Sequence, residues 1–151
     1  FLFFGLIIKE KQPYVLEYNI RLGDPETQVL SLYWDFKLSE LFLAIKERKL
    51  ENFKINFKNE HFLNVVLASK GYPFEFIKGY EIKNLDKIDE NEVIVFHAGT
   101  EFKDNKFITN GGRVLNIVGF GENRELARKR AYKYAQIIDF EGKFYRNDIG
   151  F

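Results

Sequence analysis

An alternating run of apolar residues, closed by a Gly-Asp-Pro sequence, sets the strongest limit on the fold of this chain. Apolar residues occupy every second position in the run 14–22, and Gly23, Asp24 and Pro25 follow it directly. Alternation with a period of two is typical of a β-strand that buries one face. Gly23 can adopt unusual backbone angles, and Pro25 restricts Asp24 to extended ones. We therefore expect a half-buried strand, a sharp turn, and a loop over residues 24–27.

The other face of this predicted strand carries the polar residues Glu17, Asn19 and Arg21. At about 3.3 Å per residue, Glu17 and Asn19 lie about 7 Å apart along the strand and point the same way. Carboxylate and amide oxygens are ligands that Mg²⁺ accepts while it shares its shell with phosphates and water. The pattern suggests a metal site, with Arg21 facing an anion beyond the metal. A solvated strand face without a ligand is the alternative.

Composition excludes several classes of protein. The chain has 151 residues, of which 46% are hydrophobic and 30% charged, as in a globular protein of one domain or one domain and a piece of another. With a net charge of only +1, we expect no nucleic-acid partner. The apolar run 1–8 is too short to span a membrane. The chain has no cysteine, which excludes disulfides and thiolate metal sites and fits a reducing compartment.

Short strands dominate the rest of the chain, and two helices accompany them. Amphipathic spacing predicts a helix over residues 35–49 with Asp35 at its N-cap, and a second helix that starts at Asn123. Short strands covered by two helices define the α+β class. The predicted strands span residues 1–9 and 14–22, which form a hairpin, and then 53–57, 62–68, 80–83, 93–97, 106–109, 113–119 and 143–146.

The sequence Gly111-Gly112-Arg113 is a candidate phosphate cradle. A glycine pair lets backbone N–H groups approach an anion closely, and a neighbouring guanidinium adds a bidentate contact. A plain hairpin turn is the alternative, because Asn-Gly-Gly sequences often form one. His97 ends an apolar strand, where a histidine more often has a structural role than a catalytic one.

Several strings of this chain resemble one enzyme family. The string LEYNIRLGDPETQ (residues 16–28) closely resembles the LEFNVRFGDPETQ signature of the phosphoribosylamine-glycine ligases, which belong to the ATP-grasp enzymes. Four more strings resemble strings of this family and follow the same order along the chain: LASKGYP (67–73), FHAGT (96–100), TNGGRVL (109–115) and FYRNDIG (144–150). The resemblance implies that residues 1–30 are the end of an ATP-grasp domain, formed by the hairpin. Residues 31–151 would then form a small, sheet-rich C-terminal domain.

The resemblance also implies a reaction, in which ATP phosphorylates glycine and 5-phosphoribosylamine then attacks the glycyl phosphate. Glu17 and Asn19 would bind the Mg²⁺ or Mn²⁺ that bridges the ATP phosphates, and Arg21 would act catalytically on the transferring phosphoryl group. Arg113 would hold the substrate 5′-phosphate. Further substrate contacts would come from Gly23, Asp24, Pro25, Glu26, Thr27, Gly111 and Gly112.

By the same resemblance, the chain is a C-terminal fragment of a cytoplasmic enzyme of purine biosynthesis. Its partners would be ATP, glycine, 5-phosphoribosylamine and the missing N-terminal part of the enzyme, without which we expect no turnover. Two alternatives stay open. One is a non-catalytic module for nucleotide or substrate binding or for docking, and the other is a different ATP-grasp carboxylate-amine ligase.

Overall fold

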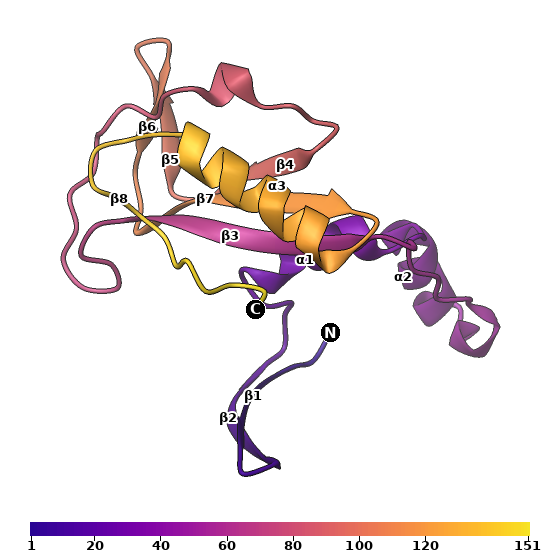
Figure 1. The fold of residues 1–151 in the computed structure, drawn as a ribbon. Coiled ribbons are helices and arrows are strands. Elements are labelled where there is room, and N and C mark those ends of the chain that lie inside the picture. Colours follow the sequence, from indigo (N-terminus) through magenta and orange to yellow (C-terminus); the bar gives the residue numbers. More distant parts are fainter.

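A four-stranded antiparallel sheet forms the body of the protein, and a two-stranded hairpin extends away from it (Figure 1). The computed structural model describes residues 1–151. The sheet has the strand order β4-β7-β3-β8. Its strands are β3 (His61–Ser69), β4 (Val93–His97), β7 (Arg113–Gly121) and β8 (Lys143–Phe144). The helices are α1 (Glu26–Tyr33), α2 (Leu38–Lys46) and α3 (Arg124–Ile137), with 3₁₀ turns at Leu50–Asn52 and Leu85–Lys87.

The helix α3 covers one face of this sheet and closes the hydrophobic core (Figure 1). The side chain of Asn123 accepts a hydrogen bond from the Leu126 N–H at 2.8 Å and so caps the helix. Small side chains on the buried stripe of α3 let the helix lie close to the strands. The core contains Leu63, Val65 and Leu67 of β3, Leu115 and Ile117 of β7, and Ala127, Ala131, Tyr134 and Ala135 of α3.

The other face of the sheet carries α1 and the turn that precedes it. Side chains alternate along a strand, so Asn64 points away from the α3 face that Leu63 and Val65 occupy. The Asn64 amide donates hydrogen bonds to the Pro25 carbonyl at 3.2 Å and to Asn116 Oδ1 at 2.9 Å. The sheet thus separates the hydrophobic core from a polar layer that holds the Gly-Asp-Pro turn.

Two hairpins complete the fold. The first pairs β1 (Phe3–Lys9) with β2 (Gln12–Asn19), and the second pairs β5 (Thr100–Lys103) with β6 (Lys106–Thr109). Each turn consists of two residues with positive φ, which is the backbone that suits the twist of a two-residue hairpin. These pairs are Glu10 and Lys11, with φ of 52° and 64°, and Asp104 and Asn105, with φ of 48° and 62°.

The α+β class is confirmed, and most of the long elements form where the sequence predicts them. The predicted helix 35–49 is shorter, at Leu38–Lys46, and its N-cap is Lys37 without a side-chain cap. It lies beyond the end of the sheet, so of the two predicted helices only α3 covers the strands (Figure 1). No helix combines the length and the apolar composition that crossing a membrane requires.

Several predicted elements are wrong. Residues 26–33 form α1, where we expected a loop that includes Glu26 and Thr27. Residues 53–57 and 80–83 form isolated bridges in place of strands, and β5 was not predicted. The division into residues 1–30 and 31–151 stays a prediction, and position 30 lies within α1.

The first hairpin is exposed on both faces, although the sequence predicts one buried face. Leu16 is 68% exposed and Tyr18 is 65% exposed. The pairing passes from Gly5 with Glu17 to Leu6 with Val15, so Leu16 forms a bulge. A bulge inserts one unpaired residue and interrupts the alternation of side chains. The regular pattern expected over residues 14–22 therefore holds only from Glu17 to Asn19, where β2 ends, and Arg21 lies outside the strand.

Candidate functional site

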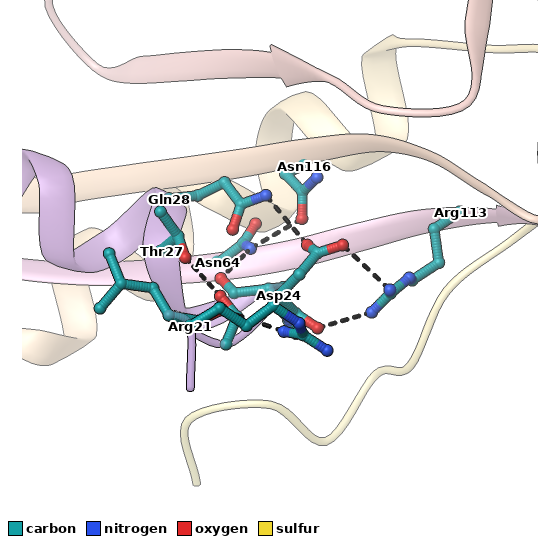
Figure 2. A network of polar contacts seen from close by, with 10 residues as sticks. Arg21, Asp24, Thr27, Gln28, Asn64, Arg113 and Asn116 are labelled. Atoms are coloured by element: carbon teal, nitrogen blue, oxygen red, sulfur yellow. Dashed lines mark hydrogen bonds and ion pairs between the residues drawn. The ribbon is translucent and has the colours of Figure 1, made fainter. Parts of the chain in front are cut away.

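Arg113, the first residue of β7, binds the Gly-Asp-Pro turn. Arg113 Nη2 lies 2.9 Å from the Asp24 carboxylate, and Nη1 donates to the Asp24 carbonyl at 2.6 Å (Figure 2). One guanidinium therefore binds both the side chain and the backbone of Asp24. The structure brings together two predicted site residues that are 89 positions apart in the sequence.

The turn also has internal hydrogen bonds that fix its shape. The Thr27 N–H donates to the Gly23 carbonyl at 2.9 Å, and the Thr27 hydroxyl donates to the same oxygen (Figure 2). Gln28 Nε2 donates to the Asp24 carboxylate at 3.0 Å. A Cβ atom at Gly23 would lie 2.2 Å from the Glu26 carboxylate, so the glycine leaves room for that side chain beside the turn. Together with the Asn64 contact to Pro25, these bonds hold the turn rigidly against the sheet.

A cavity of about 280 Å³ lies beside this turn, on the face of the sheet opposite α3. Most of its lining is apolar, and the polar groups come from separate parts of the chain. A concave apolar site with a few fixed polar groups is the usual form of a small-molecule site. Its lining includes Pro25, Asn64, Tyr72, Arg113, Tyr145 and Arg146.

Gly111 and Gly112 have tight packing roles of their own. A Cβ atom at Gly111 would lie 2.8 Å from the Cα atom of Gly99, and one at Gly112 would lie 2.1 Å from the Tyr72 ring. Ser69 holds the same segment through bonds from its hydroxyl to the Gly111 carbonyl and from its N–H to the Gly112 carbonyl. The glycine pair thus places Arg113 beside the cavity, and its contact with a phosphate stays a prediction.

Glu17 and Asn19 lie on the first hairpin, apart from the cavity. They pair with Gly5 and Phe3 in an unbroken stretch of the ladder, so both side chains leave the same face of β2. A Cβ atom at Gly5 would lie 2.8 Å from Glu17 Cγ, so the glycine leaves room for the carboxylate. The oxygen ligands and their shared face fit a hard cation that keeps several positions for phosphate and water. No group of three or more His, Cys, Asp or Glu residues is placed to hold a metal.

Arg21 makes only a local contact, since its Nη1 donates to the Leu22 carbonyl at 3.0 Å (Figure 2). His97 packs against Phe107 with 4.5 Å between the ring centroids, and its Nδ1 lies 3.0 Å from the Thr100 hydroxyl. Burial lowers the pKa of His97, which favours the neutral ring. These contacts agree with a structural role for His97.

The sequence interpretation missed Asn64 and Asn116, which connect the turn to the sheet. Both interrupt apolar runs, Leu63–Val66 in β3 and Leu115–Val118 in β7, and Asn116 is 1% exposed. A buried amide needs hydrogen-bond partners, because an unpaired one is costly. A single asparagine inside an apolar strand was therefore a signal of a polar contact behind that strand.

The contact between Asp24 and Arg113 should contribute little to stability. Both side chains are more than one third exposed, and such ion pairs contribute about 0–1 kcal/mol. We expect Asp24→Asn to lower the free energy of unfolding by less than about 1 kcal/mol, measured by urea denaturation. Glu40→Gln is the control, since it removes a more exposed ion pair with Lys37. A loss above about 2 kcal/mol would show that the pair mainly stabilises the fold.

The fold and the site define a small α+β domain in which a Gly-Asp-Pro turn is joined to the start of a central strand. The family described as phosphoribosylglycinamide synthetase, C domain, matches residues 62–151. The chain belongs to this family, as the resemblance of its sequence strings predicts. A phosphoribosylamine-glycine ligase of Caldanaerobacter subterraneus is 44% identical over 148 residues, and one of Vibrio vulnificus is 43% identical over 152 residues.

The comparisons also define how much of these relatives the chain represents. The two matches include 98% and 100% of this chain. The chain spans only 35% of the length of each relative. The crystal structure of a phosphoribosylamine-glycine ligase from Thermotoga maritima aligns with 97% of this chain, at a TM-score of 0.69 and 41% identity. The alignment covers 36% of that protein. The α+β arrangement is thus shared with a solved ligase.

Proposed function

We propose that this chain contributes to the ATP-dependent ligation of glycine to 5-phosphoribosylamine, which yields glycinamide ribonucleotide, ADP and phosphate. The contact between Asp24 and Arg113 carries the proposal, because two strings that resemble the ligase family meet there beside one cavity. The names of the relatives support the same reaction. Since the chain spans about 35% of their length, the activity is proposed for the longer polypeptide.

The proposed reaction has two steps. ATP first phosphorylates the glycine carboxylate, and the amine of phosphoribosylamine then attacks the acyl carbon and displaces phosphate. Such a reaction depends mainly on holding the reactants in line and on neutralising charge around the phosphoryl group. In this scheme Arg21 places its guanidinium against the charge of the phosphoryl group or the acyl phosphate.

The roles of Glu17 and Asn19 follow from their oxygen atoms. We propose that they hold Mg²⁺ or Mn²⁺, which would supply charge neutralisation to the ATP phosphates. Their shared face on β2 supports this assignment. Because they are only two ligands, the remaining positions of the ion would be open to nucleotide oxygens and water.

The substrate would lie between the turn and β7. Residues 23–27 would line the pocket for glycine and ribosylamine, and Arg113 would contact the 5′-phosphate with the N–H groups that Asp24 does not use. Gly111 and Gly112 would add backbone contacts. The rest of the longer polypeptide would supply the adenine site, and we place the reaction in the cytoplasm, as the purine-pathway role implies.

The test of this proposal is the substrate dependence of phosphate release. The full-length polypeptide is incubated with ATP, Mg²⁺, glycine and phosphoribosylamine, and each component is omitted in turn. We expect phosphate release and glycinamide ribonucleotide only in the complete mixture, and none from the isolated chain of 151 residues. Other amino acids in place of glycine, and other amines in place of phosphoribosylamine, are the controls.

Two outcomes would contradict the proposal. Turnover with another carboxylate or another amine, but not with glycine and phosphoribosylamine, would make the protein a different ATP-grasp ligase. No turnover with any pair, although nucleotide or substrate binds, would leave the non-catalytic module as the better description.

A further inference from the structure

Two arginines, Arg113 and Arg146, line the cavity of about 280 Å³ beside the Gly-Asp-Pro turn. Arg113 begins β7, and Arg146 follows β8 in the C-terminal segment, which runs beside β3 (Figure 1). No acidic residue lines the cavity. Both arginines have a carboxylate partner, Asp24 or Asp148, but neither partner belongs to the lining. The only charged residues in the lining are therefore these two arginines.

Arg146 is held in place by helix α3 through the backbone around it. The Tyr132 hydroxyl donates to the Arg146 carbonyl at 2.9 Å and accepts from the Ile149 N–H at 3.0 Å. Arg128 Nε also donates to the Ile149 carbonyl, at 3.1 Å. The C-terminal segment is thus fixed to the helix on both sides of Asp148. Fixed backbone reduces the entropy that a binding side chain loses when it contacts a ligand.

The guanidinium of Arg146 is oriented by Asp148 but keeps N–H groups that donate to no acceptor. Its Nε and Nη2 donate to the two oxygens of Asp148 at 2.8 and 2.6 Å, and this pairing lowers the pKa of Asp148. A guanidinium has five N–H groups, so three remain for another acceptor. Arg113 likewise uses two N–H groups on Asp24. Two oriented guanidiniums with free donors are a suitable arrangement for an anion with several oxygens.

We propose that this cavity binds the phosphate of a small phosphate monoester, and that Arg146 is its second cationic ligand beside Arg113. The apolar and aromatic lining, including Tyr72 and Tyr145, would enclose the uncharged part of the ligand. The inference rests on the proposed function, in which the monoester is the sugar phosphate substrate. It adds a residue, Arg146, whose hydrogen bonds in the structure are to Asp148 and, through its carbonyl, to Tyr132.

The experiment measures the binding of ribose 5-phosphate to the full-length polypeptide by titration calorimetry. We expect Arg146→Gln to weaken this binding by about 10- to 100-fold, which corresponds to the loss of charge-assisted hydrogen bonds. Asp148→Asn is the matched control, because it breaks the same ion pair but leaves the guanidinium at the cavity. Arg124→Gln removes an exposed arginine at the start of α3 and controls for net charge. Both controls should bind within about threefold of the unchanged protein.

Two results would overturn the inference. One is equal weakening by Arg146→Gln and Asp148→Asn, which would show that the ion pair only docks the C-terminal segment. The other is unchanged or undetectable binding of ribose 5-phosphate in all proteins. ATP titrated in parallel identifies the anion, since weakening of ATP binding alone would place Arg146 at the nucleotide and also overturn the inference.

The ligase assay separates this inference from the proposed function. If the unchanged protein ligates glycine and Arg146→Gln raises the KM for phosphoribosylamine but not for ATP or glycine, both stand. If the unchanged protein binds ribose 5-phosphate through Arg146 but ligates nothing, the cavity assignment stands and the proposed function fails. Arg146→Lys, which keeps the charge without the planar fork, should bind ribose 5-phosphate with intermediate affinity.

Discussion

Glu17→Gln in the full-length polypeptide should lower the rate of phosphate release by about 100-fold or more, since charge stabilisation by a bound metal ion contributes several kcal/mol. The substitution keeps the size of the side chain but removes the charge that would hold the ion. Glu17 is exposed and forms no ion pair, so the change should leave the fold intact. The measurement is the initial rate at several Mg²⁺ concentrations, and the variant should need more Mg²⁺ for half-maximal rate.

Glu10→Gln is the control for this prediction. Glu10 is an exposed carboxylate at the turn of the same hairpin, so the substitution changes the net charge equally without touching the proposed metal site. It should retain nearly the full rate. A Glu17→Gln variant with an unchanged rate and an unchanged Mg²⁺ requirement would exclude Glu17 as a metal ligand. Asn19 would then lose its assigned role as well, because one amide oxygen is a weak site for a hard cation.

The strongest local signals predicted the body of the fold correctly. The apolar runs of β3 and β7 needed no information beyond their own residues, because a strand covered on both faces is continuously apolar. The asparagine before α3 likewise predicted the start of that helix. Elements of this kind are specified locally, and the structure confirms them.

The helix α1 was missed because Pro25 was interpreted only as a residue that keeps Asp24 extended and so forms a turn. Proline is also favoured at the beginning of a helix, where its missing N–H is not needed. In the structure Pro25 is the N-cap residue and Glu26 provides an acidic group in the first turn. The same Gly-Asp-Pro sequence thus ends one element and starts the next.

The predicted strand at 53–57 failed for a different reason. Its two aromatic residues pack against other aromatic side chains rather than in a sheet. Phe53 contacts Phe36 with 5.5 Å between ring centroids, and Phe57 stacks on Tyr33 at 4.8 Å. Periodicity identifies which side chains share a face, but it does not identify what covers that face.

The same limit applies to the candidate site. Family resemblance placed Asp24 and Arg113 in one site, but nothing local predicts that they form an ion pair. Their contact depends on how the turn lies across the sheet. Asn64 holds the turn in this position, because its amide binds both the Pro25 carbonyl and Asn116. Arg146 could be connected to the site only after the structure placed the C-terminal segment beside the cavity.

The largest effect on stability should come from Gly119→Ala. A Cβ atom at Gly119 would lie 2.2 Å from the Ala127 carbonyl oxygen and 2.5 Å from the Ala131 nitrogen. Both are backbone atoms of α3, so no side-chain rotation can relieve the overlap. The helix would have to move off the sheet, and Ala127, Ala131 and Ala135 would lose packing against the strands. We expect a loss of about 3 kcal/mol and a decrease in Tm of about 10 °C.

Gly121→Ala in the same strand is the matched control, measured with Gly119→Ala by thermal and urea unfolding. The three atoms nearest to its Cβ atom would all belong to the Leu126 side chain, and the two at 2.9 Å, Cγ and Cδ2, can rotate away. We therefore expect Gly121→Ala to lower the Tm much less. Equal effects of the two substitutions would mean that glycine is needed in β7 for backbone reasons. A selective effect at Gly119 would show that close contact of α3 with β7 determines the packing of the core.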